Sequence, residues 1–112
     1  MSTDVSIDLE VNIERLESFE EYTGVNLQAL FASISSTNCI YISGEVHLVD
    51  GMKLKQNIQL IISAIDHLGS ILGVNRINIR ANSFFGFETF TGSIYECPGQ
   101  VAKVRVHPKN LA

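Results

Sequence analysis

The segment Lys53–Gly73, KLKQNIQLIISAIDHLGSILG, decides the fold class because its apolar residues fit two different structures. Their spacing matches an amphipathic helix, with one apolar face formed by Leu54, Ile58, Ile61, Ile62, Ile65, Leu68 and Leu72. Against a helix, the segment is rich in isoleucine, which favours strands, and Gly69 interrupts it. A strand over 58–65, a turn over 66–69 and a strand from Ser70 explain the same residues. We favour the two strands and keep a helix at about 53–72, in an α+β fold, as the alternative.

Alternation of apolar and polar residues predicts further strands on both sides of this segment. The alternation is strict over residues 5–13 and recurs over 39–49, which ends at the turn dipeptide Asp50-Gly51. Downstream, we expect strands over Arg76–Arg80, within the Phe-rich segment 84–94 and over 101–106, with Val104 and Val106 facing inward.

Residues 14–36 are ambiguous. Leu16, Phe19 and Tyr22 have helical spacing, and in a helix the glutamates Glu14, Glu17, Glu20 and Glu21 would line a solvated face. Thr23-Gly24 interrupts that pattern, and we expect a loop followed by a strand.

About seven short strands separated by turns predict an all-β fold, an antiparallel β-sandwich formed by residues 1–112 as a single domain. Pro98 and Pro108 are expected in turns, where they cost no hydrogen bond of a sheet.

Composition narrows the classes of partner. Hydrophobic residues make up 46% and charged residues 18% of the chain, which argues against disorder. The net charge is −4 and the eight Lys and Arg are scattered along the sequence, so we expect no nucleic-acid partner. The N-terminal residues MSTDVSIDLE are not expected to form a secretory signal, and apolar runs such as Leu60–Ile62 are too short for a membrane span. We therefore expect a cytoplasmic protein.

From Ile42 to Pro108 the order of features resembles a known family. The segments are SGEVHLVDG at 43–51, AIDHLGSILG at 64–73, SFFGFETF at 83–90 and KVRVHPK at 103–109. This order is similar to bacterial β-sandwich domains of the FxLYD type and their immunoglobulin-like relatives, although Ile65 stands where those domains carry an aromatic residue. The resemblance implies a β-sandwich that acts as an accessory or interaction module, and it names no site.

Residues able to carry chemistry form no motif in this sequence. His47, His67 and His107 have no metal-ligand spacing and are expected at the surface. Cys39 and Cys97 lie in no CxxC pair and are expected to be reduced, buried and inert. No serine lies in a nucleophile elbow, and no glycine-rich phosphate loop is present. We expect no catalytic residue, no cofactor and no metal, and hence no enzyme.

Two binding hypotheses remain. The first is a non-catalytic interaction or structural module that binds a protein partner or itself, with Phe84, Phe85 and Phe87 as aromatic interface candidates unless they pack in the core. In a weak homodimer, the acidic strand 5–13 would lie beside the basic strand 101–106 of another copy, which carries Lys103 and Arg105; alternatively, these strands pair within one chain. The second hypothesis is a small-ligand or metal-binding domain that uses the acidic N-terminal residues Asp4, Asp8, Glu10, Glu14, Glu17, Glu20 and Glu21.

Overall fold

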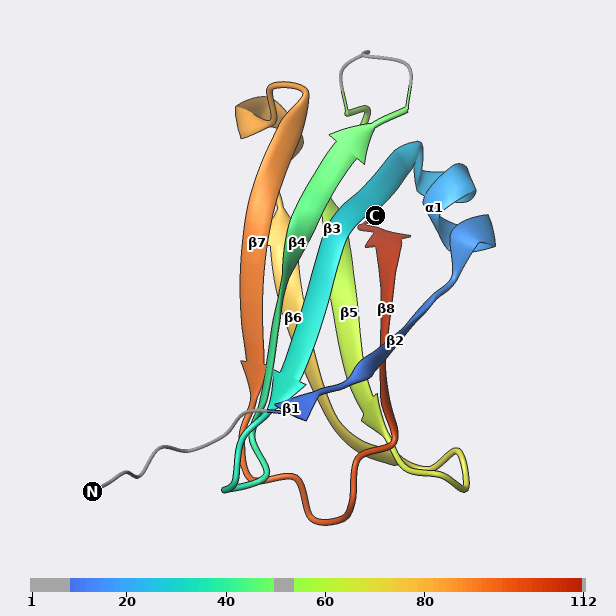
Figure 1. Cartoon of the computed structure of the whole chain (residues 1–112). Helices are drawn as coiled ribbons and strands as arrows, with labels where there is room; N and C mark the ends of the chain where they lie inside the picture. The colour runs from blue at the N-terminus through green and yellow to red at the C-terminus, as the bar shows by residue number, and fades with distance from the viewer. Residues whose placement is uncertain (1–8, 50–53, 112) are drawn as a thin grey trace, which may run out of the picture.

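Two four-stranded sheets face each other in the computed structural model, which describes residues 9–49 and 54–111 (Figure 1). The elements are β1 (Leu9–Glu10), β2 (Asn12–Arg15), α1 (Glu17–Thr23), β3 (Val25–Ile34), β4 (Ile40–Leu48), β5 (Ile58–Ile65), β6 (Ile71–Ile79), the 3-10 turn η1 (Ala81–Ser83), β7 (Phe87–Ile94) and β8 (Lys103–Asn110). One sheet has the strand order β1-β3-β4-β7 and the other β2-β8-β5-β6. Every pair is antiparallel except β2 with β8. A mostly β, two-sheet architecture is therefore confirmed.

The segment that decides the fold forms two strands, so the helix alternative is wrong. β5 lies between β8 and β6, and its Ile58, Leu60 and Ile62 are fully buried against the other sheet. The turn that follows is stabilised by Asp66, whose Oδ1 accepts hydrogen bonds from the backbone N–H groups of Leu68 (2.9 Å) and Ser70 (2.8 Å). Gly69 takes a φ of +87°, which glycine adopts without strain. These local bonds favour a hairpin over a continuous helix.

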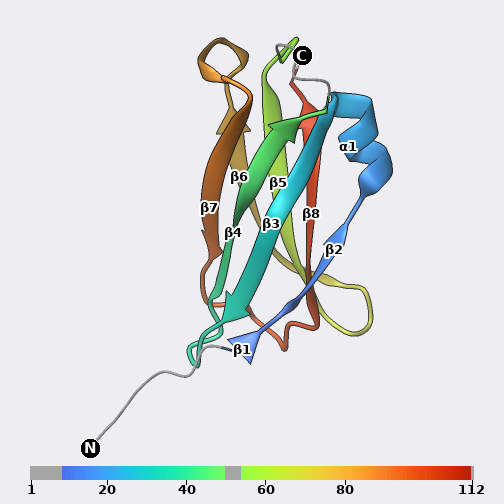
Figure 2. The ribbon, with the colours of Figure 1, turned by 45° about the horizontal axis from the view of Figure 1, so that its top comes forward.

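The N-terminal strand predicted over residues 5–13 is not one strand. Residues 5–8 lie outside the described residues, and the part that follows is divided between the two sheets (Figure 2). β1 pairs with the end of β3, while β2 pairs in parallel with β8. Val11 lies at the crossing, where it is buried and its N–H donates to Ala32 O at 2.9 Å. Alternation identifies which side chains of a strand are buried, but it does not show which sheet the strand joins. The prediction of one continuous strand was therefore wrong.

Residues 17–23 form the helix α1 instead of the expected loop, and the strand expected after it is β3. The N–H groups of Phe19 and Glu20 donate to Leu16 O. The helix ends at Gly24, whose φ is +78° and whose N–H donates to Glu20 O and Glu21 O. The buried and exposed faces of α1 are not those that the sequence pattern indicated. Glu20, expected on the solvated face, is buried (3% exposed), and Tyr22, expected on the apolar face, is exposed (82%).

Two glycines allow the sheets to approach each other on the side of β6 and β7. A Cβ on Gly73 of β6 would lie 2.6 Å from Ile94 Cγ2 of β7. A Cβ on Gly92 of β7 would lie 2.9 Å from Ile62 Cδ1 and 3.0 Å from Ile77 Cδ1 of the opposite sheet. These positions bring β7 close to β6, although the two strands belong to different sheets.

The two prolines have different places. Pro98 lies in the loop between β7 and β8, as expected. Pro108 lies within β8 and is fully buried opposite Leu60, so its expected place in a turn is wrong. The strand tolerates it because the pairing of β2 with β8 ends at Val106, which leaves no ladder on that side for Pro108 to interrupt.

Candidate functional site

The outer edge of β7 presents backbone groups that have no partner among residues 9–49 and 54–111. β7 is the last strand of its sheet and pairs only with β4 among the described strands. Gly86 O accepts a hydrogen bond from Leu48 N (3.1 Å), so this residue directs its backbone groups towards β4. In an antiparallel pair alternate residues face the same neighbour, so Glu88, Phe90 and Gly92 also face β4. The backbone groups of Phe87, Thr89, Thr91 and Ser93 then face away from it.

A side-chain contact supports this assignment and marks where the open stretch ends. Asn75 of β6 donates from Nδ2 to Ser93 O at 2.7 Å, which confirms that Ser93 faces outward. No hydrogen bond within the described part of the chain reaches the outward backbone groups of Phe87, Thr89 or Thr91. We call this stretch, Phe87–Thr91, the β7 edge.

The other outer strands differ from β7 in length or charge. β1 and β2 are only two and four residues long, and they cover β3 at Ser33 and Ile34 and β8 over residues 103–106. β6 carries an exposed Arg76. Natural proteins protect sheet edges with lysine, proline, bulges or covering segments. The β7 edge reads Phe-Glu-Thr-Phe-Thr, and the single charge in it, Glu88, is in register with the buried Val46 and so lies on the inner face.

Exposed aromatic side chains border the β7 edge. Phe85 is 87% exposed and Phe87 is 54% exposed. Phe87 stacks on His47 of β4 with ring centroids 5.1 Å apart, and His47 Nε2 lies 2.8 Å from Glu45 Oε1. Phe31 and Tyr41 are also exposed, on the same outer face of the sheet. Phe85 and Phe87 therefore place two exposed rings at one end of the β7 edge, whose backbone groups have no partner in the described part of the chain.

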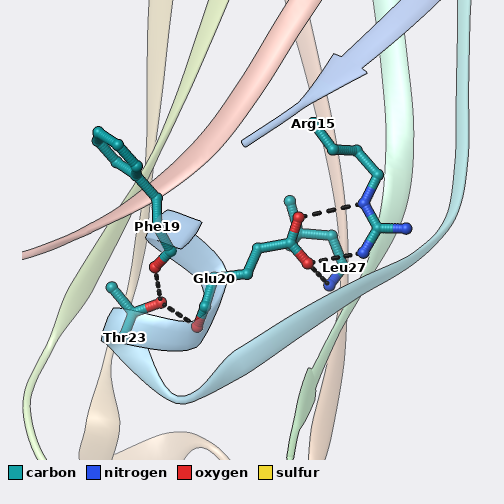
Figure 3. Close-up of polar contacts among 5 residues, drawn as sticks. All are labelled: Arg15, Phe19, Glu20, Thr23 and Leu27. Carbon is teal, nitrogen blue, oxygen red and sulfur yellow. Dashed lines mark hydrogen bonds and ion pairs between the residues drawn. The ribbon is translucent and has the colours of Figure 1, made fainter. Parts of the chain in front are cut away.

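On the side of the sandwich away from β7, Glu20 makes polar contacts with Arg15 and Leu27 (Figure 3). Its carboxylate accepts hydrogen bonds from Arg15 Nη2 (2.7 Å) and Nε (3.1 Å) and from the backbone N–H of Leu27 (3.0 Å). The carboxylate raises the pKa of the Arg15 guanidinium by direct hydrogen bonding. Glu20 thus joins α1 to β2 of one sheet and to β3 of the other, and it satisfies an N–H at the β3 edge. Sequence reasoning missed this role, since a single Glu among four carries no signal of burial.

The predicted interface residues are not brought together. Phe84 is 5% exposed and belongs to the core, so its assignment to an interface is wrong; the turn η1 directs it inward and leaves Phe85 outside. Lys103 and Arg105 lie on the other sheet, where they bind Glu14 of the same chain. The Arg105 Nε–Glu14 Oε1 distance is 2.6 Å, and this hydrogen bond is the main cause of the lowered pKa of Glu14.

These contacts decide between the two arrangements of the terminal strands. Residues 12–15 and 103–106 pair within one chain, so the expected pairing of these strands between two copies is wrong for the described residues. The basic residues are also less scattered in space than in sequence. Register places Arg76, Lys103, Arg105 and Lys109 on the outer face of one sheet, where Glu14 neutralises part of the charge.

The acidic residues proposed as a ligand or metal site do not converge. Asp4 and Asp8 lie outside the described residues, while Glu14 and Glu20 bind basic side chains of the same chain. Over residues 9–49 and 54–111, no group of three His, Cys, Asp or Glu side chains has the arrangement of a metal site. A hollow of about 490 Å³ lies where the chain crosses between the sheets, and among its described lining residues only Glu10 is ionisable. That lining supplies no acid–base pair.

The two cysteines are both buried and unbridged, and they lie in neighbouring loops. Cys97 N donates to Asn38 O at 3.0 Å, and Glu96 N points at Cys39 Sγ at 3.5 Å. The Thr37 hydroxyl and this N–H lower the pKa of the Cys39 thiol, whereas burial raises that of Cys97. Their expected lack of reactivity stays a prediction.

His107 differs from the expected surface histidine. It lies on β8 with its ring edge-to-face with Phe19, the centroids 5.0 Å apart, and its Nδ1 is buried without a partner among the described residues. Burial, with smaller effects of Arg105 and Lys109, lowers the pKa of His107. His67 is exposed, as expected, and His47 is half-buried.

The lowered pKa of His107 predicts a pH-dependent stability. The unfolded chain binds a proton at His107 more readily than the folded domain, so protonation of this residue favours unfolding. The stability that depends on neutral His107 is therefore complete above about pH 6.5 and is lost as the pH falls towards the folded-state pKa. We expect the free energy of unfolding to decrease between about pH 7.5 and pH 5.5. Urea titrations across this range measure it, and His107→Phe should flatten the dependence. An equal slope in the variant and the wild type would contradict the assignment.

Comparisons of the chain with family models, with curated proteins and with solved structures find no match. The resemblance to FxLYD and immunoglobulin-like domains therefore stays an expectation that no relative tests. In the described part of the chain, no helix has the length and apolar character needed to cross a membrane.

Proposed function

We propose that this domain is a non-catalytic interaction module that binds an extended segment of a protein partner along the β7 edge. The observation that carries the proposal is the row of N–H and C=O groups on Phe87, Thr89 and Thr91 that no described residue pairs with. An added strand pairs with such groups, and the backbone hydrogen bonds supply affinity with little dependence on the partner's sequence. We also propose a cytoplasmic location, which the two unbridged cysteines support.

The side chains beside the edge suggest how a partner is selected. A strand paired with β7 directs alternate side chains onto the outer face of the sheet, where the exposed Phe87 lies. An apolar or aromatic partner residue opposite Phe87 would contact its ring, while hydroxyl or amide residues would bond Thr89 and Thr91. The preferred ligand is thus an uncharged, alternating segment without proline.

A proline substitution tests this binding mode without removing a hydrogen bond of the folded domain. Thr89→Pro deletes an N–H that faces away from β4 and places a ring at the edge, whereas Thr89→Val keeps the N–H and a β-branched shape. Extended peptides selected from a displayed random library against the wild type are the probe, and their affinities are measured by calorimetry. We expect Thr89→Pro to weaken binding at least about tenfold and Thr89→Val to change it little. Equal affinity for wild type and Thr89→Pro, or failure to select any peptide, would contradict the proposal.

A further inference from the structure

We propose that the extended segment that occupies the β7 edge is the β7 edge of a second copy of this chain, antiparallel across a two-fold axis at Thr89. This inference rests on the proposed function and names its partner. It assigns self-association to the Phe-rich strand, away from the terminal strands that already pair within one chain.

The limits of the open stretch set the register in which two copies would pair. At one end, Gly86 has a φ of +100° and its carbonyl is bonded to Leu48, so the outward-facing groups begin at Phe87. At the other end, Asn75 occupies the carbonyl of Ser93, so the last residue with both groups available is Thr91. The stretch Phe87–Thr91 is centred on Thr89, and two antiparallel copies therefore match from end to end.

The hydrogen-bonding pattern suits this register. With Thr89 opposite Thr89 of the second copy, Phe87 lies opposite Thr91 and Thr91 lies opposite Phe87. These three residues direct both backbone groups outward, and opposed residues of that kind exchange both of their hydrogen bonds in an antiparallel ladder. The outward backbone groups of both subunits then gain hydrogen bonds together. Each subunit uses the same surface, as a closed two-fold interface requires.

The side chains also fit a second copy. Threonine opposite threonine is a favourable cross-strand pair, and each Phe87 ring lies against a threonine. In this register Glu88 is opposite Phe90 of the second copy, so no like charges face each other directly. The pairing joins the two β1-β3-β4-β7 sheets into one continuous sheet and covers the outer strand that the domain leaves unprotected.

Engineered cysteines test the register. In a hydrogen-bonded antiparallel pair the Cα atoms are about 5.5 Å apart, within the range of a disulfide. Thr89→Cys places two cysteines opposite each other at the two-fold axis, whereas Thr91→Cys, the matched control, faces Phe87. Under mild oxidation, with peptide mapping of the linkage, we expect a covalent 89–89 dimer and no 91–91 dimer. A 91–91 link that forms as readily would overturn this register.

Sedimentation equilibrium across a concentration series tests the association itself. We expect the wild type and Thr89→Val to dimerise and Thr89→Pro to weaken dimerisation at least about tenfold. A wild type that is monomeric at every concentration, or a dimer that Thr89→Pro leaves unchanged, would overturn self-pairing. If the selected peptides still bind in a manner sensitive to Thr89→Pro, the proposed function stands without a second copy. If that sensitivity is also absent, both proposals fail.

Discussion

Replacing Glu20 with alanine should lower the free energy of unfolding by about 2–3 kcal/mol. The substitution removes a buried carboxylate that accepts hydrogen bonds from Arg15 and from the N–H of Leu27. The Leu27 N–H is left without an acceptor, and an unsatisfied buried donor costs about 1–3 kcal/mol. Loss of the ion pair adds less, because the Arg15 side chain is about one-third exposed and partly screened by water.

Urea denaturation measures this loss, with two comparisons. Glu21→Ala removes an exposed glutamate from the same helix and should stay within about 0.5 kcal/mol of the wild type. Glu20→Gln keeps a carbonyl oxygen for the Leu27 N–H, so its loss should be smaller than that of Glu20→Ala. Equal effects of Glu20→Ala and Glu21→Ala would show that α1 does not join the two sheets through this carboxylate.

Gly92→Val should destabilise the domain by about 1–3 kcal/mol through overpacking between the sheets. The new Cβ would lie 2.9 Å from Ile62 Cδ1, 3.0 Å from Ile77 Cδ1 and 3.5 Å from Ile42 Cγ2. These atoms come from both sheets, and the γ-methyl groups of valine leave little room for the isoleucines to move away. Relief requires β7 to shift away from β5 and β6.

The matched control for Gly92→Val is Thr91→Val, at the neighbouring position of the same strand but on its outer face. It adds no contact with the opposite sheet and should change the free energy of unfolding by less than about 0.5 kcal/mol. Thermal and urea denaturation measure both variants. If Gly92→Val were as stable as Thr91→Val, the close approach of the sheets at β7 would be wrong.

Patterns of alternation predicted most strands of this fold but not their neighbours. Val104 and Val106 face inward as expected and are fully buried, because alternation reports which side chains share a face. It does not report which strand pairs with which, so the division of the N-terminal segment between β1 and β2 was not predictable. The apolar spacing of residues 58–79 fits both a hairpin and a helix. The turn residues Asp66 and Gly69 distinguish the two better, because they favour a tight turn between two strands.

The candidate site was predictable only in part. The Phe-rich segment could be recognised as an interface candidate from the sequence. The sequence does not show which of its phenylalanines are exposed: Phe84 is buried, while Phe85 and Phe87 are exposed. The β7 edge itself depends on the strand order, because a strand is open only when nothing pairs with its outer side. The role of Glu20 was also not predictable, because its partners on β2 and β3 come together only in the folded domain.

Amide hydrogen exchange along β7, followed residue by residue by NMR, tests the central claim that this strand has an open edge. In a dilute sample, the amides of Glu88, Phe90 and Gly92, which face β4, should exchange slowly. The amides of Phe87, Thr89 and Thr91 should exchange rapidly and become protected when a peptide or a second copy binds. Slow exchange of all these amides in the dilute, unbound domain would mean that the edge is already covered, and it would contradict the account.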